Sequence, residues 1–108
     1  MVQHMLADMA TQIEAARLLT HKAATAEPPQ VVLSSMAKVF ASDAAVKVAT
    51  DAVQIMGAYG TTGKSGAEKY FRDAKMTQIF EGTNEICRLA ITAPMLQYAG
   101  LGTIGGSD

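Results

Sequence analysis

The sequence has no tryptophan, few aromatic residues (6%) and a single cysteine, Cys87. One cysteine excludes an intramolecular disulfide and a cysteine-based metal cluster, and it favours a reducing compartment. The two histidines, His4 and His21, have no second ligand at a metal-binding spacing. We therefore expect a cytoplasmic protein without a metal site.

Excess charge and long apolar runs are also missing. The 9 basic and 10 acidic residues give a formal net charge of -1, which offers a nucleic-acid backbone no electrostatic attraction. No apolar run approaches the roughly 18 residues of a membrane span. The first residues lack the basic start and the cleavage site of a secretory signal. We expect a soluble, unprocessed chain that does not bind nucleic acid and has no membrane span.

Alanine is the commonest residue, within an apolar fraction of 49%. Alanine loses no side-chain entropy in a helix and lets helix backbones approach each other closely. A chain of 108 residues with this apolar fraction is sufficient for one modest core. The composition therefore predicts a single all-α domain.

Apolar residues recur at helical spacing in four segments of the chain. The predicted helices cover residues 3–25, 30–56 and 67–76, with a last helix that begins at Thr83 or Asn84. The Pro28-Pro29 pair ends the first helix, and the glycines between 57 and 66 predict a loop. We predict an up-and-down four-helix bundle over residues 1–99 and a flexible tail over 100–108.

Several side chains have predicted places in this bundle. Asp43 and Lys47 are four residues apart, which favours an exposed ion pair on one helix. In the last helix we expect Ile86, Leu89 and Ala90 to be buried. Pro94 is expected to kink that helix or to end it early.

Two segments are candidates for chemistry, and the residues alone leave two interpretations of each. The glycines between 57 and 66 fit neither the P-loop nor the dinucleotide motif, so they form either a flexible connection or a binding loop. Glu81 follows Ile79 and Phe80 and precedes Gly82 at the start of the last helix. An apolar setting there would strengthen the carboxylate as a base, and the alternative is an ordinary loop glutamate.

A set of motifs over roughly residues 2–92 resembles a known family. These motifs are Met5–Met9, Glu14–Leu19, Met36–Ser42, Gln54–Gly60, Tyr70–Lys75 and Gln78–Arg88. In their order and spacing they resemble the C-terminal helical domain of the acyl-CoA dehydrogenase family.

The resemblance implies an FAD-dependent oxidation of an acyl-CoA thioester to its trans-2-enoyl form. Glu81 matches the catalytic base, and Gly82 matches a residue in contact with the substrate. Residues that match FAD contacts are Thr83, Asn84 and Glu85 and, toward the FAD of a neighbouring subunit, Gln54, Ile55, Met56, Gly57 and Ala58.

The resemblance also implies partners. They are an acyl-CoA substrate, further copies of the chain or a partner with the family's other two domains, and an electron-transfer flavoprotein as acceptor. Because those domains hold most of the flavin in the family, we expect no activity from this chain alone. The alternative is a non-catalytic helical bundle that acts as an oligomerisation or interaction module, or more remotely a helical regulator that binds through its first helix.

Overall fold

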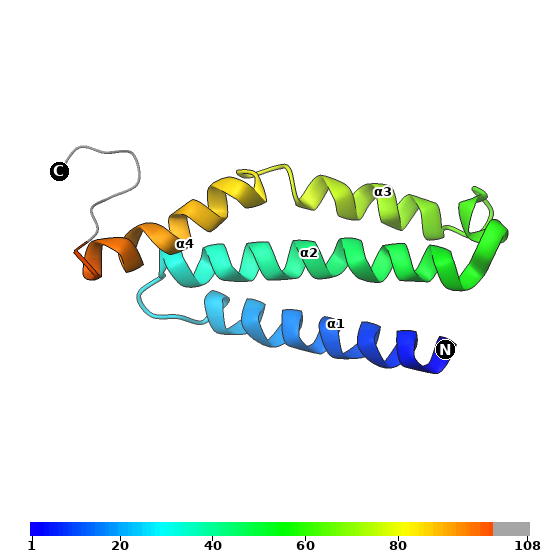
Figure 1. Cartoon of the computed structure of the whole chain (residues 1–108), viewed down its shortest axis with the longest axis horizontal. Coiled ribbons are helices and arrows are strands. Elements are labelled where there is room, and N and C mark those ends of the chain that lie inside the picture. Colours follow the sequence, from blue (N-terminus) through cyan, green and yellow to red (C-terminus); the bar gives the residue numbers. More distant parts are fainter. Residues whose placement is uncertain (101–108) are drawn as a thin grey trace.

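A computed structural model describes residues 1–100, in which all regular structure is helical (Figure 1). The α-helices are α1 (Val2–Ala24), α2 (Val31–Met56), α3 (Ala67–Thr77) and α4 (Asn84–Tyr98). The prediction of an all-α bundle is confirmed, and the predicted bounds of the first three helices and the predicted start of the last agree with the observed ones to within a residue or two. Apart from Gly100, the tail predicted over 100–108 lies outside the described residues.

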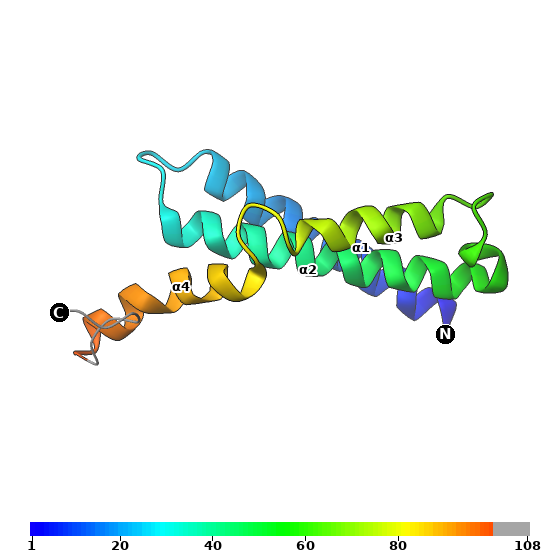
Figure 2. The same cartoon turned by 90° about the horizontal axis from the view of Figure 1, so that it is seen from above.

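Helix α2 is the central element of the bundle. Helix α1 runs antiparallel to α2 on one side, and α3 and α4 follow one another along the other side, both antiparallel to α2 (Figures 1 and 2). All three pack against α2. The molecule is elongated, 54 Å long and 24 Å across. The loop that joins α3 to α4 therefore lies beside the middle of α2.

The core consists of small side chains. The buried apolar residues are Ala37, Ala44 and Ala49 of α2 and Ala67 and Ala74 of α3. No large side chain of residues 1–100 is completely buried. None of the helices in this part of the chain has the length and the apolar character needed to cross a membrane.

The predicted burial of Ile86 and Leu89 is wrong, because these side chains are 58% and 43% exposed. The side of α4 that is less exposed passes instead through Asn84, Cys87 and Ile91, which are three and four residues apart. A periodic apolar pattern identified the helix correctly, but it did not identify which side of the helix faces α2.

Helix α4 begins at the predicted position, but it does not end early at Pro94. The Thr83 hydroxyl accepts a hydrogen bond from the Ile86 amide at 3.3 Å, so Thr83 is the N-cap. The helix continues past Pro94 to Tyr98, which makes the predicted early end wrong. Proline removes one backbone donor, but the following turn still closes, with Ala99 N donating to Met95 O at 3.1 Å.

Residues 57–66 are more regular than the predicted loop. A 3₁₀-helix, η1 (Gly57–Thr61), directly follows α2, where Gly57 turns the chain with a φ of +63°. The Thr61 hydroxyl donates to Ala58 O at 2.7 Å, which helps to close this tight turn. The prediction is therefore wrong for residues 57–61.

Gly60 is the position in η1 that tolerates a side chain least. A Cβ atom there would lie 2.7 Å from the Val53 carbonyl oxygen and 3.1 Å from the Met56 Cβ. We expect Gly60→Ala to lower the free energy of unfolding by about 1–3 kcal/mol, the usual cost of overpacking. Urea denaturation checks this value, with Gly63→Ala as the matched control, because a Cβ at Gly63 has nothing within 4 Å. Equal stability of the two variants would contradict the close packing of η1 on α2.

Candidate functional site

The site is built on the loop between α3 and α4. The amides of Ile79 and Phe80 both donate to Met76 O at 3.0 Å, and the Asn84 amide donates to Gln78 O at 3.1 Å. Between these bonds the chain reverses through Glu81, with φ +56°, and Gly82, with φ +90°. A left-handed φ is unusual for a residue with a side chain and persists where the surroundings impose it.

Asn84 connects this loop to α2. Asn84 is buried, with only 3% of the residue exposed. The Asn84 Nδ2 donates to Ser42 Oγ at 2.8 Å and to Asp43 Oδ1 at 2.7 Å, and its Oδ1 accepts from Lys38 Nζ. The amide hydrogen-bonding groups of this side chain are thus used within the chain.

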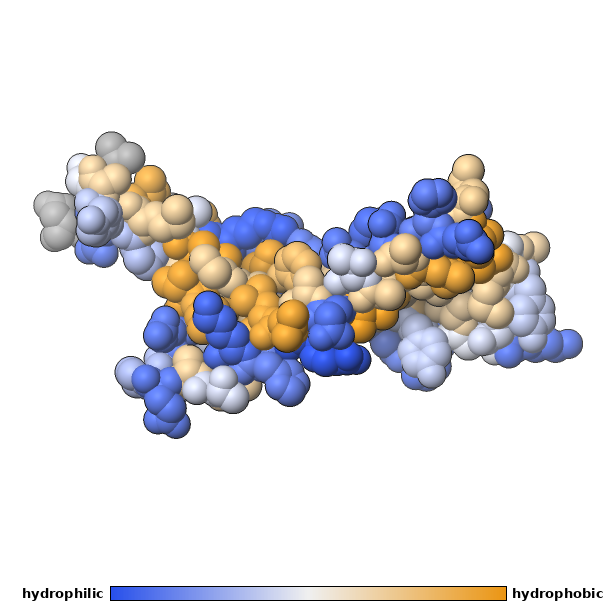
Figure 3. All heavy atoms as spheres, turned by 90° about the horizontal axis from the view of Figure 1, so that it is seen from below, coloured by the Kyte–Doolittle hydropathy of each residue, from blue (hydrophilic) through white to orange (hydrophobic). Residues whose placement is uncertain are grey.

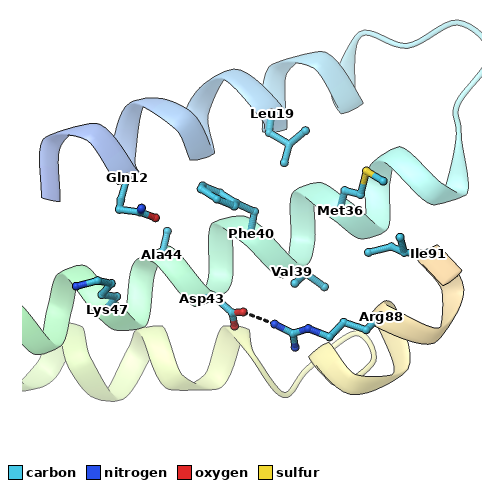
Figure 4. A pocket seen from close by; sticks show the side chains of 10 residues that line it. All are labelled: Gln12, Leu19, Met36, Val39, Phe40, Asp43, Ala44, Lys47, Arg88 and Ile91. Carbon is cyan, nitrogen blue, oxygen red and sulfur yellow. Dashed lines mark hydrogen bonds and ion pairs between the residues drawn. The ribbon is translucent and has the colours of Figure 1, made fainter. Parts of the chain in front are cut away.

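Asp43, which accepts a hydrogen bond from Asn84, also accepts hydrogen bonds from two further side chains. Its carboxylate accepts from Gln78 Nε2 at 2.9 Å and from Arg88 Nη2 at 2.6 Å, the latter drawn in Figure 4. The predicted ion pair between Asp43 and Lys47 does not form, because Asp43 faces α4 while Lys47 pairs with Asp51 at 3.2 Å. Asp43 is therefore part of the site's support.

The surroundings of Asp43 lower the pKa of its carboxyl group. Burial by itself would raise this pKa, but hydrogen bonds from Arg88, Asn84 and Gln78 and the charge of Arg88 outweigh it. The pKa therefore lies below its ordinary value of 3.8.

This lowered pKa predicts a pH dependence of stability. A carboxyl group whose pKa is lower in the folded state stabilises the fold above its unfolded pKa, and this stabilisation is lost as the pH falls through the folded value. We expect the urea concentration at the midpoint of unfolding to decrease as the pH is lowered below about 4. In Asp43→Asn this decrease should be smaller. Urea titrations between neutral and acidic pH check this, with the exposed Asp8→Asn as control. An acid limb as steep in Asp43→Asn as in the wild type would contradict it.

Glu81 lies at the edge of an open pocket of about 300 Å³. Lys38 and Ser35 of α2 and Cys87 of α4 line the same pocket. The apolar enclosure predicted for Glu81 is not formed by residues 1–100, because Ile79 and Phe80 are 50% and 51% exposed and Glu81 is exposed as well. The carboxylate is thus accessible to a molecule or a domain that covers this side of the loop.

The structure brings together only part of the predicted site. Glu81, Gly82, Thr83, Asn84 and Glu85 are consecutive around the α3–α4 loop and the start of α4. The second group, Gln54, Ile55, Met56, Gly57 and Ala58, lies at the other end of α2 and the start of η1. The axial distance from Ser42, beside the loop, to Gln54 is about 18 Å at the rise of an α-helix. One chain therefore presents two separate surfaces.

Sequence reasoning missed the residues of α2 that hold the loop, namely Lys38, Ser42 and the true role of Asp43. Ser42 comes four positions after Lys38 and so lies on the same face of α2, and Asp43, the next residue, borders that face. Polar residues at a four-residue spacing on this alanine-rich helix were the signal that could have identified Lys38 and Ser42. The pattern did not contain the identity of their partner, Asn84.

A second hollow, away from Glu81, lies between α1, α2 and α4. It is an open groove of about 530 Å³. Its apolar lining comes from Leu19 of α1, from Met36, Val39 and Phe40 of α2 and from Ile91 of α4 (Figure 4). On the side of the molecule seen in Figure 3, hydrophobic residues gather along the centre and hydrophilic residues border them.

Comparison with known proteins gives the family of this chain. A model described as "Acyl-CoA dehydrogenase, C-terminal domain" matches residues 1–96. Cyclohexane-1-carbonyl-CoA dehydrogenase of Geobacter metallireducens is 49% identical over 102 residues, which cover 92% of this chain and 27% of that protein. The chain belongs to the acyl-CoA dehydrogenase family, and it matches the C-terminal domain.

Two solved structures are similar to this chain in both sequence and fold. Butyryl-CoA dehydrogenase from Megasphaera elsdenii has a TM-score of 0.83 and 45% identity, covering 87% of this chain and 25% of that one. A chain from a study of the electron transferring flavoprotein of Acidaminococcus fermentans has a TM-score of 0.84 and 51% identity, covering 88% and 26%. The chain thus spans about a quarter of the length of the relatives that it matches.

Proposed function

We propose that this chain supplies the catalytic base and part of the flavin contacts for α,β-dehydrogenation of an acyl-CoA thioester. The observation that carries the proposal is the left-handed turn at Glu81–Gly82, which is held against α2 and leaves the carboxylate exposed beside a pocket. Membership of the acyl-CoA dehydrogenase family supports the same assignment. Such chemistry takes place within an assembly that also contains the rest of the flavin site.

Glu81 would act through two groups. Its carboxylate removes the proton from the carbon α to the thioester carbonyl, as a general base. Its backbone N–H donates to the carbonyl oxygen, where negative charge develops during proton removal. FAD, when bound, would supply the acceptor for the hydride that leaves the β carbon. The neighbouring Gly82, which has no side chain, leaves room for the substrate next to the turn.

The start of α4 fits hydroxyl groups of FAD better than its phosphates. The amides of Asn84, Ile86 and Cys87 already donate to Gln78 O, Thr83 Oγ1 and Thr83 O. The Thr83 hydroxyl keeps its own proton for donation, and the exposed Glu85 carboxylate can accept from a hydroxyl group but would repel a phosphate. Asn84 contributes by holding Thr83 and the turn in place, since its side chain is buried.

The second surface, Gln54 to Ala58, would contact FAD held by a neighbouring subunit. Its separation from the Glu81 loop along α2 supports this division, because two copies related by a two-fold axis can bring the Glu81 loop of one and this second surface of the other to the same flavin. A homo-oligomer, or a partner that contains the flavin-binding domains, completes the site. An electron-transfer flavoprotein is the proposed acceptor, supported by the relative from the Acidaminococcus fermentans study.

A second candidate function is that of an interaction module without catalysis. The apolar groove between α1, α2 and α4 and the absence of completely buried large side chains in residues 1–100 favour it. A surface of this kind is usually covered by another protein surface. This function predicts oligomers that form without FAD and that behave identically when Glu81 is changed.

One experiment separates the two functions. The purified chain is mixed with FAD and passed through a size-exclusion column with light scattering and flavin absorbance detection. Flavin that co-elutes with an oligomer of defined mass, and that is bleached by acyl-CoA, supports the enzymatic function. Oligomers that bind no flavin even after the missing domains are added in trans support the interaction module and contradict the enzymatic function.

A further inference from the structure

Lys38 is the residue of α2 that reaches the catalytic turn. Its Nζ donates to the Gly82 carbonyl oxygen at 2.8 Å and also to Asn84 Oδ1. These partners are 44 and 46 positions away along the chain. Lys38 is half-buried and forms no ion pair with a carboxylate among those found in residues 1–100, so its ammonium group is directed to these two oxygens.

The turn that Lys38 reaches requires such support. Glu81 has a left-handed φ of +56°, and the next carbonyl group, that of Gly82, is the one that Lys38 binds. A residue with a side chain keeps this conformation where surrounding contacts outweigh its strain. The Asn84–Gln78 backbone bond closes the loop from the α3 side, and Lys38 fastens it from the α2 side.

We propose that Lys38 is a positioning residue for Glu81. The proposal rests on the proposed function, because it assumes that Glu81 is the base. By fixing the Gly82 carbonyl and Asn84, Lys38 holds the backbone of the turn and so positions Glu81, which lines the same pocket as Lys38. Lysine suits this role because its ammonium group has three donors and no acceptor, so it can serve two oxygens at once.

Hydrogen exchange in the full chain tests the structural part. Lys38→Met keeps the length of the side chain and removes both charge-assisted bonds. We expect the backbone amide hydrogen of Asn84 to exchange at least about tenfold faster, which corresponds to the loss of one such hydrogen bond. The control is Lys47→Met, which removes an exposed lysine of the same helix that pairs with Asp51, and exchange at Asn84 should not change. Lys38→Arg retains charged donors and should keep exchange slow.

Flavin reduction by acyl-CoA in the assembled flavoprotein tests the functional part. We expect Lys38→Met to slow the limiting rate of reduction by about tenfold or more, with the flavin content and the acyl-CoA dissociation constant unchanged. A purely structural role would lower flavin content or affinity together with the rate. The Lys47→Met control should match the wild type in all three quantities.

The outcomes are distinct. Unchanged exchange at Asn84 in Lys38→Met overturns the proposal, and so does fast exchange with an unchanged rate of flavin reduction. If Lys38→Met does not fold, Lys38→Arg decides, and fast exchange at Asn84 in that folded variant overturns the proposal. If instead Glu81→Gln reduces flavin as fast as the wild type, the proposed function fails. The exchange data then still decide whether Lys38 holds the turn.

Discussion

Glu81→Gln is expected to slow flavin reduction by acyl-CoA by about 10²–10⁴-fold, the range for loss of a general base. Glutamine keeps the size of the side chain and the backbone N–H, but it cannot accept the α proton. Since the backbone of the turn is unchanged, binding of FAD and of acyl-CoA should persist. The measurement is stopped-flow absorbance of the flavin in the assembled protein under single-turnover conditions.

Glu85→Gln is the matched control for this experiment. It makes the same chemical change four residues along the chain, at an exposed carboxylate in the first turn of α4. We expect a far smaller effect on the rate, and any loss should be in flavin affinity. Comparable rates in Glu81→Gln and the wild type would remove Glu81 from the role of base. Equal losses in both variants would point to electrostatics of the whole loop.

Asn84→Ala is expected to have the largest effect on stability. The substitution removes the side-chain hydrogen bonds to Lys38, Ser42 and Asp43 and leaves a void where the amide was buried. Loss of a buried polar network of this kind costs about 2–4 kcal/mol of the free energy of unfolding. Urea denaturation of the full chain followed by circular dichroism measures the change.

Gln97→Ala is the control for Asn84→Ala, because Gln97 is an amide on the same helix whose side chain is exposed. We expect its effect on unfolding to stay within about 0.5 kcal/mol, as for most surface substitutions. Asn84→Asp provides a second probe, since it keeps the shape but replaces two donors by a carboxylate beside Asp43. If Asn84→Asp were as stable as the wild type, the hydrogen bonds assigned to the amide would be wrong.

The Asn84 substitution also tests how structure and chemistry are coupled at the loop. Because the amide fixes Thr83 and the Glu81–Gly82 turn against α2, the same variant should lose activity even at temperatures where it remains folded. That loss should be larger for Asn84 than for Gly60→Ala, whose strain is at the opposite end of α2.

The sequence by itself determined the helices and the location of the candidate base. Helical periodicity is a local property, so the elements could be predicted to within a residue or two, as for the start of α4 at Asn84. The motif around Glu81 consists of consecutive residues, and its resemblance to the acyl-CoA dehydrogenase family singled out Glu81 as the candidate base. Proline and glycine were weaker indicators of where helices end, because α4 continued past Pro94 and residues 57–61 formed η1.

Only the tertiary structure decided which residues hold Glu81 and which surfaces remain open. The bonds from Asn84 to Ser42 and from Lys38 to Gly82 join positions more than forty residues apart. They depend on the axial register and rotation of α4 against α2, and a periodic pattern does not contain either quantity. The exposure of Glu81 and Ile86 has the same cause. Burial depends on what packs against a residue, so the apolar neighbours of Glu81 in sequence did not enclose it in space.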